Sequence, residues 1–409
     1  MRTVLFFLAC AVVSSNLLSC YRESSKTAKQ QVDFSAATAL LDVLQASVDE
    51  SPNCDSITDR LSSLPRQQRD ALLDSLIAAK ESKPALVRRI HALIESPAYR
   101  LYYRQFRNVK PDDHRRILLA LPYEAIPSPA DISRNLLEIT VHLPSVRSWI
   151  KGLSSRIDLD TCRSIAERWL PDGEHEIPET FFIFDGNGDA FAHDGQVCFD
   201  LYSLVLARRS PDTRYEGLDT LSADGIEPVL AHEFHHIFAQ PYFAPSRDEA
   251  ADWTIRWRNR LIRRLVTEGT AMHCNPPEGF NRTIKEDTAV VVHWLRELDK
   301  MMALVKSGEV AEEVASDWLG NTYQEAARSV LRQYLSRTIP EDELEREVKA
   351  HEIDRPSLVY TLGWWMVSHI SDKGFNPEAV HELIKHPLTL FERYNAKVSP
   401  GADSLKTHR

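Results

Sequence analysis

The sequence contains no long run of lysine or arginine, and its 49 basic residues are outnumbered by 59 acidic ones, for a net charge of −10. The basic surface that nucleic-acid-binding proteins present to phosphates is therefore missing, which excludes nucleic acid as a partner. Only 14 of the 409 residues are glycine and 22 are proline, which excludes a collagen-like or low-complexity chain. With 43% hydrophobic residues, the chain can bury a sizeable core.

Two common catalytic signatures are also missing. No serine or cysteine lies in a nucleophile elbow of the G-x-S-x-G type. No glycine-rich phosphate loop of the G-x-x-x-x-G-K-[ST] or G-x-G-x-x-G type occurs either. These absences argue against a hydrolase with a serine or cysteine nucleophile and against a nucleotide-binding enzyme.

The N-terminal segment predicts export. Arg2 is followed by an apolar run over residues 4–13, which is typical of a secretory signal and is too short to span a membrane as a helix. The end of the segment, Leu17-Leu18-Ser19-Cys20, resembles a bacterial lipobox, in which the cysteine becomes the lipid-bearing first residue of the mature protein. We therefore expect residues 1–19 to be a lipoprotein-type signal peptide.

This resemblance implies a protein of the bacterial cell envelope, anchored through Cys20 at the periplasmic or outer-membrane face. Residues 20–31 would form a flexible tether, because their only large apolar side chain is Tyr21. Ordinary signal cleavage near residues 15–19, with Cys20 incidental, is the alternative, and it also exports the protein. Disulfides form in such a compartment, and the remaining cysteines are even in number, so one or two disulfides are expected. These cysteines are Cys54, Cys162, Cys198 and Cys274.

Helical periodicity dominates the first part of the chain. Leucines recur mostly every three or four residues, as at Leu40 and Leu44 and again from Leu86 to Leu93. Prolines, among them Pro84, separate these segments. We expect residues 32–153 to form an N-terminal helical region.

A short sheet is expected in the next part of the chain. Residues 180–184 read as a buried strand, and the segments 190–193 and 196–201 flank Asp194-Gly195, which is a hairpin turn signal. From Gly225 onward, helical patterns return. The fold class is therefore mainly α with one small sheet (α+β), and residues 154–395 are expected to form the second domain.

The segment His232-Glu233-Phe234-His235-His236 is a complete H-E-x-x-H motif. On a helix, the imidazoles of His232 and His236 project from one face and can share one Zn²⁺, while Glu233 lies about 100° round, where a general base belongs. Pro228 fits the first turn of such a helix and Pro241 is expected to end it. The alternative is a solvated face of histidine and glutamate that holds no metal.

A catalytic zinc site normally has three protein ligands, so a further ligand is expected downstream. Glu268 lies on the apolar stripe of a predicted helix, in line with Leu261, Leu265 and Met272. A buried carboxylate must be protonated, paired or bound to metal, because an isolated buried charge costs several kcal/mol, on the order of 5. Zinc would satisfy Glu268, and Gly269 beside it would let the H-E-x-x-H helix and the helix of Glu268 approach closely.

Other ligand sets remain open at this point. Glu249 competes for the third position, although Ser246 and Glu249 together form a capping box that already accounts for it. His273 is a further candidate. A di-iron site would need a second Glu-x-x-His, which Glu378 and His381 supply, but Glu378 also fits the first turn of a capped helix.

The H-E-x-x-H helix followed by the Glu-Gly-x-Ala segment Glu268–Ala271 resembles the gluzincin superfamily of zinc metallopeptidases. The His-His ending of HEFHH is shared with a bacterial family of uncharacterised zinc-dependent peptidases. The resemblance covers roughly residues 179–384 and implies a gluzincin-like domain with a small sheet and an active-site helix. It also implies that a strand before this helix, at 190–193 or 196–200, pairs with extended substrate.

The segment from Tyr360 to Gly363 resembles the Tyr-x-x-Gly helix found late in related families. In a zinc peptidase, a phenol opposite the metal can donate a hydrogen bond to the oxyanion, and Tyr360 is the candidate for this role. The alternative is a core tyrosine packed beside Trp364. Tyr323 and His369 are rival donors.

Together these residues predict an exported zinc metallopeptidase that hydrolyses peptide bonds in a peptide or protein substrate. His232, His236 and Glu268 would hold Zn²⁺, and Glu233 would act as the general base. The alternative is a catalytically inactive zinc-binding lipoprotein that binds a peptide or a partner protein, because the same metal ligands would be present in it.

Overall fold

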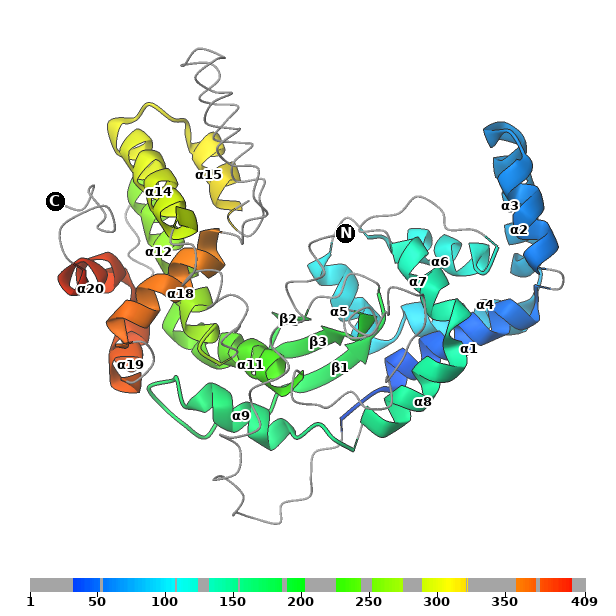
Figure 1. Ribbon diagram of the computed structural model, residues 1–409, viewed down its shortest axis with the longest axis horizontal. Helices are drawn as coiled ribbons and strands as arrows, with labels where there is room; N and C mark the ends of the chain where they lie inside the picture. Colours follow the sequence, from blue (N-terminus) through cyan, green and yellow to red (C-terminus); the bar gives the residue numbers. More distant parts are fainter. Residues whose placement is uncertain are drawn as a thin grey trace. The chain divides into compact units, whose positions relative to one another are not determined.

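The computed structural model describes residues 32–51, 54–106, 109–123, 132–153, 155–185, 190–202, 226–243, 252–274, 289–320, 322, 358–372 and 376–398. These residues are mainly helical and include one three-stranded sheet, which confirms the predicted fold class (Figure 1). Residues 1–31 lie outside the described part, so the signal peptide, the tether and the lipid anchor stay predictions.

The chain forms two compact units that interleave along the sequence. One comprises Thr161–Glu176 and the described residues from Phe234 onward. The other comprises the described residues up to Asp160 together with those of Ile177–Glu233, so the sheet groups with the N-terminal helices. The predicted modular division at residue 153 stays a prediction.

Short helices fill the chain before the sheet, as the apolar periodicity predicts. Prolines occupy the first position of α4, α5 and α6, where the missing N–H leaves no helical bond unmade. Leu40 and Leu44 of the first helix are fully buried, and this helix packs against α4 and α6. The helices are α1 (Ser35–Asp49), α2 (Cys54–Ser63), α3 (Arg66–Glu81), α4 (Pro84–Ile94), α5 (Pro97–Gln105), α6 (Pro111–Ala120), α7 (Ile132–Val141) and α8 (Leu143–Leu153).

The sheet consists of β1 (Glu179–Ile183), β2 (Ala190–His193) and β3 (Gln196–Asp200) in the order β1-β3-β2. Strand β3 runs parallel to β1 and antiparallel to β2. Asp194 and Gly195 join β2 to β3 with φ of 50° and 74°, which confirms the predicted hairpin turn. Because β3 is paired on both sides, its edges are occupied, whereas among the described residues β2 is paired on one side only.

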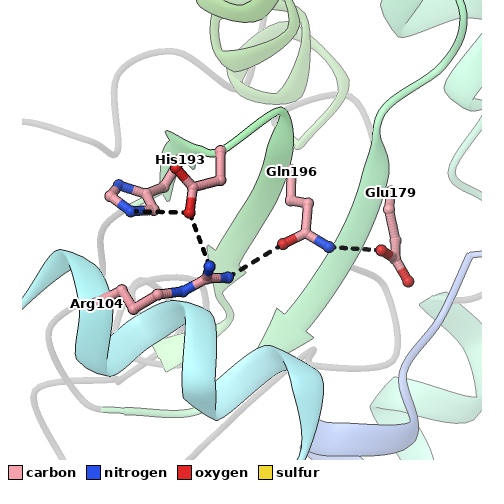
Figure 2. Close-up of polar contacts among 5 residues, drawn as sticks. Arg104, Glu179, His193 and Gln196 are labelled. Carbon is pink, nitrogen blue, oxygen red and sulfur yellow. Dashed lines mark hydrogen bonds and ion pairs between the residues drawn. The ribbon is translucent and has the colours of Figure 1, made fainter.

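An exposed polar network fixes this hairpin to its own unit (Figure 2). Arg104 of α5 donates to Asp194 at 2.7 Å and to Gln196 at 3.4 Å. Gln196 in turn donates to Glu179 of β1 at 2.6 Å, and His193 lies 3.5 Å from Asp194. Exposed pairs of this kind add little to stability. They connect the Asp194-Gly195 turn, which joins β2 to β3, to α5 and β1.

Helices return after the sheet, as predicted, and none of those described is long and apolar enough to cross a membrane. The largest helix contact of this part is that between α12 and α18 (Figure 1). The elements after the sheet are α11 (Ile226–Phe243), α12 (Trp253–Ala271), α14 (Ala289–Ser307), α15 (Glu312–Gly320), α18 (Leu358–Ile370), α19 (Pro377–Lys385), the 3₁₀ helix η8 (Pro387–Thr389) and α20 (Leu390–Lys397). Helix α9 (Leu159–Glu167) precedes the sheet.

The predicted disulfides are wrong for the four cysteines of the described chain, which are all free. Cys54 lies on α2, Cys162 on α9, Cys198 on β3 and Cys274 just after α12, and the last three are buried. An even number of cysteines does not bring their side chains to bonding distance, because packing decides where each one lies. Burial raises the pKa of the Cys198 and Cys274 thiols, which keeps them protonated and unreactive.

Candidate metal centre

Helix α11 carries the H-E-x-x-H motif in its middle turns. At 3.6 residues per turn, His232 and His236 lie on one face, as the spacing predicts. The helix does not end at Pro241 as predicted but runs on to Phe243. A proline this close to the end removes only one helical hydrogen bond, so the last turn tolerates it.

The motif is more deeply buried than a solvated helix face would be. His232 and Glu233 are each 7% exposed, and the His236 side chain is 17% exposed. Phe234 and Phe238 of the same helix are also buried. The structure therefore argues against the solvated alternative, because polar side chains enclosed in this way need a bonding partner.

The third group comes from helix α12, where Glu268 lies among buried apolar side chains. Leu261 and Leu265 are fully buried, and Glu268 itself is 5% exposed, so the predicted apolar stripe is confirmed. Helix α12 begins after Asp252, whose carboxylate accepts the backbone N–H of Thr254 at 2.8 Å.

The ligand atoms of His232, His236 and Glu268 all lie within 4.8 Å of one another. Nε2 of His236 lies 3.4 Å from Oε2 of Glu268. Zinc bonds of about 2.0–2.1 Å in a tetrahedral arrangement place neighbouring ligand atoms about 3.4 Å apart. The separation of this pair therefore already matches one edge of a zinc tetrahedron.

The donor set also fits zinc. Two imidazoles and one carboxylate are a common protein ligand set of catalytic zinc sites, in which the fourth position is left to water or substrate. A zinc site normally needs at least three histidine, cysteine, aspartate or glutamate side chains close together. Among the described residues, His232, His236 and Glu268 meet this condition. Glu233 follows His232 on the same helix, so the predicted general base lies next to the first ligand.

The structure does not place the alternative ligands in this group. Glu249 and its capping partner Ser246 lie outside the described residues. The Nδ1 atom of His273 is hydrogen-bonded to the carbonyl oxygen of Gly269 at 2.9 Å, and its Nε2 atom is hydrogen-bonded to the hydroxyl of Ser371 at 3.4 Å. Burial lowers the pKa of His273 to about 4, so this imidazole is neutral and serves as a link between α12 and the end of α18.

The structure also argues against the di-iron alternative, because Glu378 and His381, its second Glu-x-x-His pair, have other roles. His381 binds the carbonyl oxygen of Arg168 through Nε2 at 3.1 Å. Glu378 is exposed in the first turn of α19, where Asn376 caps the helix by accepting the N–H of Ala379 at 3.1 Å. The helix-cap interpretation of this segment is thus confirmed.

Helix α18 carries the proposed oxyanion donor. Tyr360 is half-buried on this helix, and its role stays a prediction. His369, its rival, binds the carbonyl oxygen of Trp365 through Nδ1 at 2.8 Å and packs its ring against Trp365 and Tyr394. Tyr323 lies outside the described residues.

In a comparison with protein families, residues 90–398 match the family described as "Putative zinc dependent peptidase (DUF5700)". No curated protein and no solved structure matches. The match covers more than half of the chain and contains all three residues of the metal group. It begins within α4, so it reaches further toward the N-terminus than the segment 179–384 on which the sequence resemblance rested.

Proposed function

The chain belongs to this family of zinc-dependent peptidases, and on that premise we propose that it is a zinc metallopeptidase of the gluzincin type that hydrolyses peptide bonds. The observation that carries the proposal is the group formed by His232, His236 and Glu268. Two histidines one helical turn apart and a glutamate from the following described helix are the gluzincin arrangement that the motifs predict.

Each residue of the site has a distinct part in this proposal. Bound Zn²⁺ supplies a Lewis acid that polarises the scissile carbonyl and lowers the pKa of water. His232 and His236 hold the metal from one face of α11, and Glu268 completes the set from α12. Glu233 accepts the proton of the attacking water and passes it to the leaving amine. Tyr360 is the proposed hydrogen-bond donor to the oxyanion.

The sheet supports an extended peptide as the substrate. A strand with one free edge can pair with a peptide through main-chain hydrogen bonds. Of the two strands expected to do so, β3 is paired on both sides, whereas β2 is paired on one side among the described residues. We therefore assign substrate pairing to residues 190–193 of β2.

Elemental mass spectrometry on the chain from Tyr21 onward tests the metal site. We expect about one zinc per chain in the parent, in keeping with a single mononuclear site. Glu268→Ala removes a ligand and should lose most of the zinc, whereas Glu249→Ala should keep it. Absence of zinc in the parent, even after reconstitution, would withdraw the proposal.

The general base is tested separately from the metal. Glu233→Gln keeps the size of the side chain but cannot take a proton, so it should retain zinc and lose about 100-fold or more of the hydrolysis rate on mixed peptides. A zinc-loaded variant with the full rate would show that Glu233 is not the base. A parent that binds zinc but turns over no peptide would favour the alternative, an inactive module that binds a peptide or partner protein.

We also propose that the protein is exported and anchored in the envelope through Cys20. The support is the apolar run and the lipobox-like segment that precede this cysteine. Expression in a bacterial host with a palmitate analogue should label the parent in the membrane fraction. Cys20→Ser should abolish the label, and a labelled Cys20→Ser protein would contradict the anchor.

A further inference from the structure

Helices α12 and α18 touch backbone to backbone directly beside the third metal ligand. Gly269 follows Glu268 in α12, and it faces Gly363 of α18. A Cβ added at Gly269 would lie 2.5 Å from the carbonyl carbon of Gly363, and closer still to its oxygen. A Cβ added at Gly363 would lie 2.5 Å from the carbonyl oxygen of Leu265. Neither position accepts a larger residue unless the helices move apart.

A second contact fixes the same pair of helices just beyond the crossing. Val367 of α18 packs over Gly269, so that a Cβ there would lie 2.8 Å from Cγ2 of Val367. The imidazole of His273, which follows α12, is hydrogen-bonded to the carbonyl oxygen of Gly269 in that helix and to the hydroxyl of Ser371, which follows α18. Two contacts along the helix fix both its position and its rotation, whereas one contact would leave it free to turn.

The proposed zinc site of His232, His236 and Glu268 requires the two helices to be placed accurately. The Nε2 atom of His236 and the Oε2 atom of Glu268 are 3.4 Å apart, which is the separation that a shared zinc requires. Metal bonds tolerate deviations of only about 0.2 Å. Relieving a Cβ contact at the crossing to ordinary van der Waals distance would separate the helices by about 1 Å. A shift of that size is several times the tolerance of the site.

We propose that Gly269 and Gly363 are positioning residues of the metal site, through which α18 sets the place of the Glu268 carboxylate. Helix α18 contributes none of the three ligands in the described metal group. Its role is to fix the backbone from which the third ligand projects. The inference rests on the proposed zinc site, and it adds that affinity and coordination geometry depend on the glycine crossing.

The test substitutes Gly363→Ala in the chain that carries the proposed site. Zinc affinity is measured by competition with a chromophoric chelator, and the coordination geometry is read from the visible ligand-field bands of the Co²⁺-loaded protein. We expect zinc affinity to fall about 10-fold or more and the Co²⁺ bands to change, because displaced supporting residues typically cost 10–100-fold in affinity. Helix content by circular dichroism should match the parent.

Matched controls separate positioning from general stability. Gly320→Ala adds the same methyl group at the end of α15, where nothing lies within 4 Å, and should leave both readouts unchanged. Ser371→Ala removes only the hydroxyl that binds His273, adds no clash, and should lower zinc affinity by a smaller factor. This second variant decides the question if Gly363→Ala fails to fold.

The outcomes are distinct from those of the proposed function. A parent that binds zinc, together with folded Gly363→Ala of the same affinity and the same Co²⁺ spectrum, would overturn the positioning role and leave the zinc site standing. The positioning role would also be overturned if Gly363→Ala does not fold and Ser371→Ala has the zinc affinity and the Co²⁺ spectrum of the parent. A parent that binds neither metal would overturn both proposals.

Discussion

A single buried residue outside the metal site, Lys80, shows how strongly the interior constrains an ionisable group. Lys80 on α3 is 2% exposed. Its ammonium donates to the hydroxyl of Ser47 at 2.8 Å and to the carbonyl oxygen of Leu121, and it lies 4.5 Å above the ring of Tyr123. Burial lowers the pKa of Lys80 from 10.5 to about 7, because the charged form has lost most of its water.

This shift predicts a stability that depends on pH. Between the folded pKa of about 7 and the unfolded value of 10.5, the unfolded chain binds the extra proton, so the free energy of unfolding should rise as pH rises. One proton contributes at most about 1.4 kcal/mol per pH unit. Urea unfolding from pH 7 to 10 should show this rise in the parent and a flatter profile in Lys80→Met.

A matched control for this prediction is Lys83→Met. Lys83 pairs with Glu50 at the surface, with half of its side chain exposed. Its removal should leave the pH slope of the parent intact. An unchanged slope in Lys80→Met would show that this lysine is not the group that titrates.

At the level of helices, the ends of the elements are set by short-range signals that the sequence displays. Prolines begin α4, α5, α6 and α19, and aspartate or asparagine side chains cap α12 and α19. Each cap satisfies a backbone N–H that has no helical partner. Helix α19 also packs against α12 and α18, so its cap stabilises the part of the chain that carries Glu268.

Removing one cap should therefore lower stability without emptying the metal site. Asn376→Ala deletes the acceptor of the Ala379 N–H and should destabilise the protein by about 1 kcal/mol. Asn376→Asp keeps an acceptor and should lie near the parent. Chemical denaturation measures the change, and zinc content should stay at the parental value. A loss of zinc in Asn376→Ala would mean that this cap supports the site more directly than expected.

At the level of the whole chain, the metal would link folding to binding. The three residues that could hold the metal come from two helices that are separate in the sequence, so the unfolded chain does not hold them together. A metal that binds only the folded chain stabilises it by about 2.7 kcal/mol at a free concentration 100 times its dissociation constant.

Zinc should accordingly raise the melting temperature of the parent, and a chelator should lower it again. His236→Ala should abolish the zinc-dependent rise, because it removes one of the three ligands. Glu233→Gln should keep the rise, because Glu233 is not part of the ligand set. Scanning calorimetry with and without zinc measures both effects. An equal rise in the His236→Ala protein would show that zinc acts at another place.

The local features of this protein are predictable from the order of its residues alone. The periodicity of α11 placed His232 and His236 on one face, and that of α12 placed Glu268 on a buried stripe. The Asp194-Gly195 turn and the cap of α19 were also predicted correctly. These features depend on residues within one or two helical turns or one hairpin, so neighbours in the sequence suffice to define them.

Contacts between residues that are far apart in the sequence become apparent only in the folded chain. Gly269 was expected to let the H-E-x-x-H helix approach α12, and this was wrong, because the residue that faces it, Gly363, lies in α18, far along the chain. The cysteines stay apart despite their even number, and Lys80 is buried although lysine is usually exposed. Such contacts depend on how complementary shapes pack across the interior, and the periodicity of a single segment carries no information about the segment that will lie against it.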